Sequence, residues 1–241
     1  MKRTERQHLK ENELAHLAAR TRAALEDRGG QLAKIVIVVA VVLVAVIGFT
    51  VYRNTTTGRA GRLLGEAMAL QDVRVGPPAL PGTPNQGPSF PNEREKTQAM
   101  LTKFKAVADQ FPATPEGIFA RYREAGAQMA LGNPKDAAAA YDKVIAADGD
   151  GIYGQMARLG LAEAQARSGE LDKAIETFKT LSANKDGSLP VDGILLQLGR
   201  LYREAGKTTD AEQAFSRLVE EFPDSQFVSD ARRELEAIKK G

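Results

Sequence analysis

The most regular feature of the sequence is the spacing of its apolar positions, which repeats every 37 residues. Within each period these positions recur three and four residues apart, the spacing that places them on one face of an α-helix. An aromatic position marks the repeat at Phe104, Tyr141, Phe178 and Phe215. Small residues keep the same interval at Ala125, Ala162 and Gly199, at Ala137, Ala174 and Ala211, and at Gly132, Gly169 and Gly206. Such a period predicts stacked helical hairpins.

Each period predicts two helices joined by a glycine-containing turn. In "GNPKDAAAAYDKVIAAD" we expect Asn133 to cap the second helix, with Pro134 at its first position, where the missing N–H costs nothing. Because the small residues of the two helices face each other, the helices can pack closely. The aromatic residue then fills the gap to the next hairpin.

Residues Asp192 to Ser225 carry a resemblance to a known family. They resemble a tetratricopeptide repeat, with matching positions at Gly199, Tyr202, Gly206, Ala211, Phe215 and Pro223. The stretches Gln155 to Ser188 and Ile118 to Gly151 are similar but looser. The resemblance implies an all-α fold, an α-solenoid of tetratricopeptide hairpins over residues 96–225 with a capping helix at 226–241. Gly206-Lys207-Thr208 is then a turn between helices, and Leu201 stands where a nucleotide-binding P-loop needs glycine.

The repeat before these is interrupted by proline. Lys96 to Phe111 reads as a second helix, and Thr57 to Asp72, within residues 53–75, as the first. Residues 76–95 lie between them and hold six prolines from Pro77 to Pro91. This composition cannot form a helix or a central strand, so we interpret it as a linker or surface loop. A ligand for a proline-binding module is the alternative.

A second region, Ile35 to Tyr52, has 18 residues without a charge. At about 1.5 Å per residue it spans about 27 Å, near the thickness of a bilayer core, which predicts a transmembrane helix. A buried core helix and a cleaved signal peptide are the alternatives. The preceding tail, residues 1–34, holds eight Lys and Arg. This excess predicts a cytoplasmic N-terminus and a C-terminal domain across the membrane.

Composition disfavours several classes of function. The chain has no cysteine, and its two histidines, His8 and His16, lie in the tail. Glu93 to Gly241 carries 21 basic and 24 acidic residues, without the basic excess of a nucleic-acid binder. Asp148 and Asp150 lack the remaining ligands of a calcium loop and read as a turn. We therefore expect no enzyme, no cofactor and no metal site.

The family resemblance implies which residues face the concave groove of the solenoid. We expect there Phe119, Tyr122, Gly126, Met129, Met156, Leu159, Glu163, Ala166, Gly193, Leu196, Arg200 and Arg203. For Leu159 and Leu196, packing in the core is an equal alternative. The lysine and asparagine with which some members clamp a C-terminal carboxylate are absent, so an apolar, adaptable groove for protein segments is expected.

The order of tail, span and repeats resembles the single-span family to which the ancillary subunit of the SecYEG translocon belongs. This resemblance implies a bacterial inner-membrane protein with a periplasmic domain, acting as a scaffold or chaperone adaptor. Its partners would be translocon subunits, periplasmic chaperones or envelope proteins. The last repeat is also similar to envelope proteins of outer-membrane assembly and cell-division coordination, which is the alternative. The sequence leaves the oligomeric state open.

Overall fold

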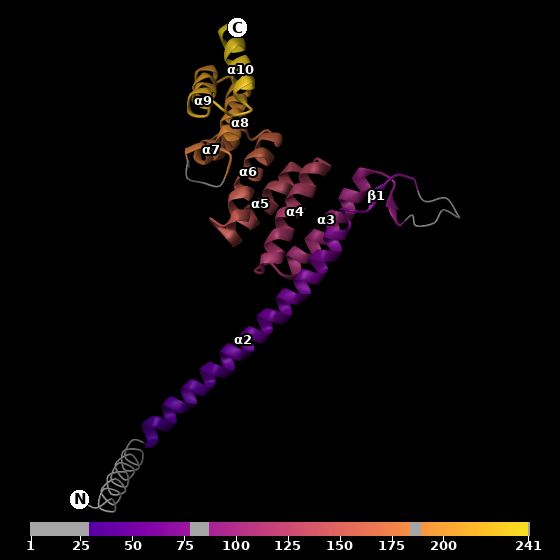
Figure 1. Cartoon of the computed structure of the whole chain (residues 1–241), viewed down its shortest axis with the longest axis vertical. Coiled ribbons are helices and arrows are strands. Elements are labelled where there is room, and N and C mark those ends of the chain that lie inside the picture. The colour runs from indigo at the N-terminus through magenta and orange to yellow at the C-terminus, as the bar shows by residue number, and fades with distance from the viewer. Residues whose placement is uncertain (1–28, 78–86, 184–188, 241) are drawn as a thin grey trace, which may run out of the picture. The chain divides into compact units, whose positions relative to one another are not determined.

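The computed structural model describes residues 29–77, 87–183 and 189–240, and these are almost entirely helical (Figure 1). Most of the predicted tail and the centre of the Pro-rich stretch lie outside the described residues. The chain divides into two compact units, residues 1–55 and 56–241. The fold expected from the sequence, an apolar helix followed by an all-α solenoid of hairpins, is confirmed.

Helix α2 (Gly29–Ala69) contains the apolar segment. Every side chain from Ile37 to Thr55 is exposed, and among the described residues α2 is the one helix long and apolar enough to cross a membrane. The helix runs on without a break to Ala69, although the sequence suggested a separate helix from Thr57 to Asp72. No proline interrupts it, and glycine, unlike proline, keeps the backbone N–H that a helix needs.

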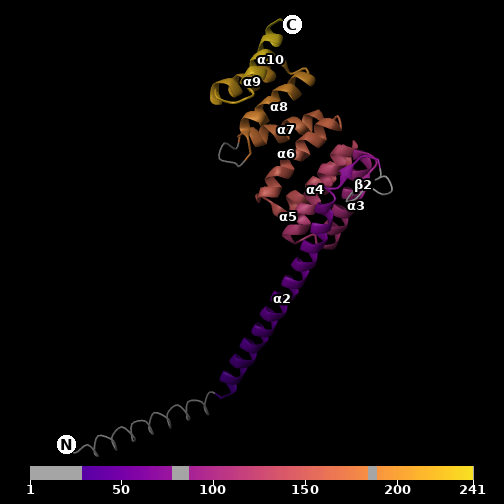
Figure 2. The ribbon, with the colours of Figure 1, turned by 45° about the vertical axis from the view of Figure 1, so that its right-hand side comes forward.

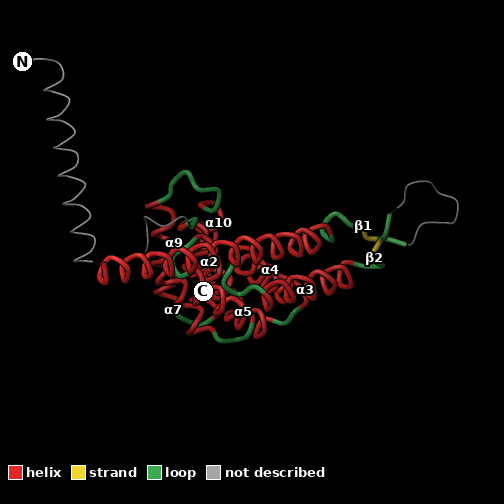
Figure 3. The backbone as a smooth tube through the Cα atoms, turned by 90° about the horizontal axis from the view of Figure 1, so that it is seen from below, coloured by secondary structure: helices red, strands yellow, loops and turns green. Residues whose placement is uncertain are grey.

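The first hairpin of the second unit pairs the C-terminal part of α2 with α3 (Glu93–Gln110) (Figure 3). Ala60 and Ala67 of α2 pack with Phe104 and Val107 of α3. Two short strands, β1 (Arg74–Val75) and β2 (Ser89–Phe90), pair in parallel beyond the helices. Helix α3 begins three residues before the expected start, because the Asn92 side chain accepts a hydrogen bond from the Glu95 N–H at 2.9 Å.

Three further hairpins and one helix follow in chain order (Figures 1 and 2). Their helices are α4 (Pro115–Leu131), α5 (Pro134–Asp148), α6 (Ile152–Arg167), α7 (Leu171–Ala183), α8 (Val191–Glu204), α9 (Thr208–Glu221) and α10 (Val228–Lys240). The turn glycines Gly132, Gly169 and Gly206 have φ of 82°, 79° and 71°, the left-handed region that favours glycine. The second helices α5, α7 and α9 therefore start at the 37-residue interval of the sequence.

The expected cap at Asn133 is wrong in detail. Pro134 does begin α5, but the Asn133 side chain makes no hydrogen bond to that helix. Its Nδ2 instead donates to Oε1 of Gln128 in the preceding helix, at 2.9 Å. The backbone of Asn133, with φ −109° and ψ 64°, departs from the extended conformation of a capping residue.

The small repeat positions lie where the helices of each hairpin meet. The five alanines Ala125, Ala137, Ala162, Ala174 and Ala211 are fully buried. The aromatic repeat positions are buried beside them, in clusters that continue into the next hairpin or, for Phe215, into α10. At Gly199 an added Cβ would lie 2.4 Å from Cε1 of Phe215. The aromatic ring therefore occupies the space that a larger side chain would need, and the burial of each such ring stabilises the fold by about 1.5 to 3 kcal/mol.

Candidate protein-binding surface

The residues expected in the groove divide into a partly exposed group on α4 and α6 and a group on α8 that is either buried or held in ion pairs. On α4 and α6 the side chains of Phe119, Tyr122, Met129, Met156 and Leu159 are partly exposed, and Glu163 is exposed. Helices α4 and α6, the first helices of two successive hairpins, contact each other. The open positions therefore share one surface.

Aromatic rings connect these two helices. The rings of Phe119 and Tyr153 have centroids 5.4 Å apart, and those of Tyr122 and Tyr153 are 6.0 Å apart. Tyr122 also lies 5.9 Å from the buried Tyr141 of α5. Such tilted pairs stabilise by about 0.5 to 1.5 kcal/mol beyond their buried area. The rings of α4 are thereby held in place by the next hairpin.

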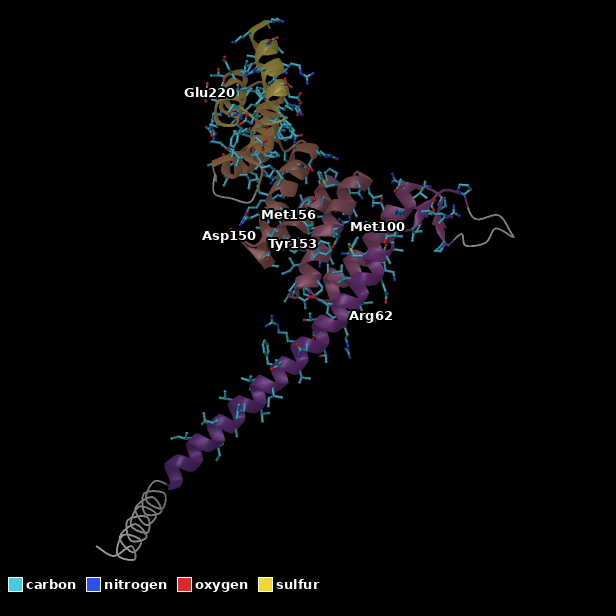
Figure 4. The ribbon with its side chains drawn as sticks, in the orientation of Figure 1. Arg62, Met100, Asp150, Tyr153, Met156 and Glu220 are labelled. Carbon is cyan, nitrogen blue, oxygen red and sulfur yellow. The ribbon has the colours of Figure 1, made fainter. Side chains whose placement is uncertain are left out.

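Two further residues extend this surface, and sequence reasoning missed both. Ile152, the first residue of α6, is 64% exposed, and Tyr153 follows it. Figure 4 labels Tyr153 and Met156 one turn apart near the start of α6, with Asp150 just before the helix. We call Phe119, Tyr122, Ile152, Tyr153 and Met156 the aromatic face. In the sequence, Ile152 and Tyr153 form an apolar pair directly after Gly151, outside the positions that the family resemblance assigns to the groove. That pair could have indicated an extension of the surface.

Burial keeps the phenols of Tyr122 and its neighbour Tyr141 uncharged. Burial raises the pKa of Tyr141 to about 12, and the negative charge of Glu163 adds to the shift. Burial likewise raises the pKa of Tyr122. Both phenols are therefore neutral at physiological pH. The face can offer rings for stacking and hydroxyl groups for hydrogen bonds, with the Glu163 carboxylate at its edge.

The residues expected in the groove on α8 are not available in the same way. Leu196 is 3% exposed and packs with Phe215 in the core, which is the alternative that the sequence left open. The Arg200 side chain forms ion pairs with Asp230 at 3.3 Å and Glu234 at 3.5 Å, and Arg203 pairs with Glu234. Both carboxylates belong to α10. The C-terminal helix thus holds the two arginines of α8 in ion pairs, although their side chains remain 44% exposed.

Between α3 and α4 lies a group of paired charges, two of them buried, that the sequence did not reveal. Arg121 is 8% exposed and Glu124 5% exposed, and their side chains pair at 2.7 Å. Arg121 also donates to Asp109 of α3 at 2.6 Å, and Lys105 lies 3.3 Å from Asp109. The hydrogen bond from Arg121 lowers the pKa of Asp109. Arg121 and Glu124 are buried, whereas the side chains of Asp109 and Lys105 are about half exposed, and the ion pairs among them link α3 to α4.

A separate cleft lies among the helices of the last two hairpins. It is a cleft of about 520 Å³ between α7 and α9, with Leu198 and Tyr202 of α8 among its lining residues. Its rim carries Asp172 and Lys207, which pair at 2.8 Å. Because Lys207 also lowers the pKa of Asp172, the rim is an ion pair already satisfied within the chain.

The described residues contain no cysteine, no histidine and no cluster of three acidic side chains that could hold a metal ion. The arrangement therefore offers stacking, apolar contact and hydrogen bonding. Those are the means by which helical arrays bind other chains.

Comparisons with known proteins agree with this architecture. A family model described as "Tetratricopeptide repeat-like domain" matches residues 30–239. A tetratricopeptide repeat protein from Parabacteroides merdae is similar in structure, with a TM-score of 0.56 at 17% identity, covering 75% of this chain and 60% of that one. A putative kinesin light chain with TPR-like repeats from Podosopora anserina has a TM-score of 0.53 at 15% identity, covering 61% of this chain and 80% of that one.

At these identities the solved structures support the fold alone. No curated protein sequence matches the chain. The family model, in contrast, runs from the first turn of α2 to the last turn of α10. By that match the chain belongs to the family of tetratricopeptide repeat-like domains.

Proposed function

We propose that the protein is a membrane-anchored scaffold that binds segments of other proteins on the aromatic face. The observation that carries this proposal is the contrast along the row of first helices. On α8, Arg200 and Arg203 are held by α10, whereas on α4 and α6 the rings stay partly exposed. Fully buried rings would serve packing alone, so exposed rings fixed by their neighbours indicate a binding surface.

The apolar segment of α2 supplies the anchor. Within it, Ile35 to Tyr52 is uncharged and the described side chains are exposed, as expected of a helix in contact with lipid. Basic residues gather in the tail before it, which supports a cytoplasmic N-terminus and a periplasmic repeat domain. Cleavage by protease added outside spheroplasts, at sites in the repeat domain, tests this orientation. Protection of the domain would reverse it.

We place the scaffold at the protein-export machinery, as an adaptor for translocon subunits, periplasmic chaperones or emerging chains. The order of basic tail, single span and tetratricopeptide domain supports this assignment. The alternative is an adaptor for envelope assembly or cell division, which the resemblance of the last repeat supports.

Photo-crosslinking in cells tests both. A photoreactive residue replaces Tyr122 or Glu163, and the adducts are identified by mass spectrometry. Lys143, exposed on α5, is the matched control position. Translocon subunits, chaperones or secretory chains captured at Tyr122 and not at Lys143 support the export assignment. Capture of outer-membrane assembly or division proteins alone replaces it with the alternative. Equal adducts at all three positions contradict the binding surface itself.

A further inference from the structure

The Glu163 carboxylate lies at the edge of the aromatic face and has no ion-pair partner among the residues that the structure describes. We propose that the protein segments bound on this face carry a lysine or arginine, which pairs with Glu163, close to a large apolar side chain, which packs on the rings. This inference rests on the proposed function and deepens it, because it names the chemistry of the partner. It assigns to Glu163 the selection of basic over acidic segments.

Helix α6 places the carboxylate in line with the apolar part of the surface. Met156, Leu159 and Glu163 are three and seven residues apart, so they follow one side of the helix, and all three are at least partly exposed. Glu163 lies about 10.5 Å beyond Met156 along the axis. An extended chain at about 3.3 Å per residue covers that distance in about three residues. A bound segment can therefore reach the rings and the carboxylate with two side chains of one short motif.

The basic residues of α4 and α6 leave this carboxylate without a partner. The two described helices contain four arginines and no lysine, and none of the four forms an ion pair with Glu163. Arg121 is buried in its own ion pairs, and Arg123 lies over a ring of α3, 5.5 Å from its centroid. Arg158 pairs at 3.0 Å with an aspartate just before α6. Arg167, one turn beyond Glu163, forms no ion pair with it.

The next hairpin shows how the equivalent position is satisfied. Arg200 stands 37 residues after Glu163. It pairs with Asp230 at 3.3 Å and with Glu234 at 3.5 Å, both on α10. The two positions of α8 that correspond to these carboxylates, again 37 residues earlier, carry no charge: Gly193 and Gln197. The chain thus supplies an opposite charge for Arg200 and none for Glu163.

A basic side chain gains from both parts of this surface. Its ammonium or guanidinium group pairs with the carboxylate, and its apolar stem packs beside the Tyr122 ring. A cation near the face of a tyrosine ring is attracted by that ring as well. An acidic segment would meet repulsion from Glu163 instead. Because Glu163 is exposed, the preference for basic segments should weaken as salt screens the pair, whereas the apolar contact persists.

Fluorescence anisotropy on the purified full-length protein in detergent tests this preference with defined peptides. Each labelled, end-capped peptide of about ten residues carries one Phe-Leu pair and one lysine, placed two to five residues to either side, in an alanine and serine background. The matched set has glutamate in place of lysine. Glu163→Lys is the test variant.

Glu220→Lys is the matched control, because Glu220 is an exposed glutamate of α9 in another hairpin (Figure 4). Both substitutions are at exposed positions and should leave the fold intact, which circular dichroism checks.

We expect the tightest lysine peptide to bind at least about fivefold more tightly than its glutamate counterpart at low salt, the size of effect that an exposed ion pair and its reversal give. The ratio should approach one at about 0.5 M salt. Glu163→Lys should reverse the order of the two sets, and Glu220→Lys should leave the ratio unchanged. Tyr153→Ala should weaken both sets about tenfold, because it removes a ring that both use.

Four outcomes overturn the proposal: no lysine peptide binds, the two sets bind equally, the glutamate set binds more tightly, or the lysine preference survives Glu163→Lys. Photo-crosslinking at Tyr122 separates this failure from that of the proposed function. If Tyr122 captures proteins and Glu163→Lys leaves the yield unchanged, the scaffold stands and selection by charge falls. If Tyr122 captures no more than Lys143 does, the aromatic face is not a binding surface and both fall.

Discussion

Two contacts between successive hairpins have equivalent places in this solenoid, but one is apolar and the other contains buried charges. Between α7 and α8, where the third hairpin meets the fourth, Phe178 and Leu181 pack against Ile194 and Leu198. Between α3 and α4, where the first meets the second, an apolar floor around Phe104 supports buried charges. An apolar contact gains stability from each group buried. A buried ion pair gains little overall but is costly to break on one side, so it favours a single geometry.

The largest expected effect comes from placing a charge in the apolar contact. Ala174 is fully buried in the same cluster as Phe178 and Ile194, and Ala174→Asp supplies a carboxylate without a partner. We expect a loss of about 4 kcal/mol or more in the free energy of unfolding. Chemical denaturation followed by circular dichroism measures it. Ala139→Asp, at an exposed position of α5, should stay within about 0.5 kcal/mol. A wild-type midpoint for Ala174→Asp would refute the packing described above.

The second prediction concerns the contact between α3 and α4, where a substitution removes one partner of a buried ion pair. Arg121→Met leaves Glu124 buried without its 2.7 Å partner and Asp109 without its hydrogen bond from Arg121. The free energy of unfolding should fall by about 3 kcal/mol. The double variant Arg121→Met with Glu124→Leu should recover most of that loss, because the remaining buried charge is removed as well. If the losses in unfolding free energy of Arg121→Met and Glu124→Leu simply add in the double variant, the two side chains do not stabilise the fold as a pair.

The aromatic repeat position offers a third comparison, because Tyr141 stands where the C-terminal hairpins have Phe178 and Phe215. Its pKa of about 12 in the folded chain lies above the value near 10 expected on unfolding. The resulting stability is complete below about pH 10 and is lost as the pH rises toward 12. The loss should approach about 2.7 kcal/mol at pH values above 12. Tyr141→Phe should remove this part of the pH dependence, measured as the difference between the two unfolding profiles. Parallel profiles would contradict burial of the hydroxyl.

Two helical glycines give the smallest effects, with opposite signs. Gly199→Ala forces a Cβ against the Phe215 ring and should cost about 1 to 2 kcal/mol. Gly126→Ala meets open space and should stabilise by about 0.5 to 1 kcal/mol, since alanine loses less backbone entropy in a helix. Thermal unfolding of both variants measures the pair. Equal shifts would mean that α8 and α4 are equally open at these positions.

Much of the fold could be predicted because the repeat is carried by residues whose roles are local or steric. A glycine at a left-handed turn and an alanine at a helix crossing are recognisable from their spacing alone. Gly132, Gly169 and Gly206 show this, since the period predicted all three turns. The helix boundaries were less accurate where a side chain decides them, as Asn92 does at the start of α3.

The candidate site could be predicted only in part, because exposure depends on which helix comes next. Leu196 and Met156 both fit groove positions, yet one is buried in the core and the other is partly exposed. Arg200 reads as a free groove residue until α10 is placed beside it. Glu124 reads as a solvated helix face, and only the packing of α3 against α4 buries it. In each case the deciding partner lies on another helix.

The 37-residue interval between the starts of α5, α7 and α9 has a consequence for how such a chain can change over time. An in-frame duplication or deletion of one interval within this stretch would bring each turn glycine back to an equivalent place. The first hairpin and α10 would remain as the two ends. The length of the array can therefore vary in whole hairpins through single genetic events, each adding or removing one step of surface while the ends stay intact.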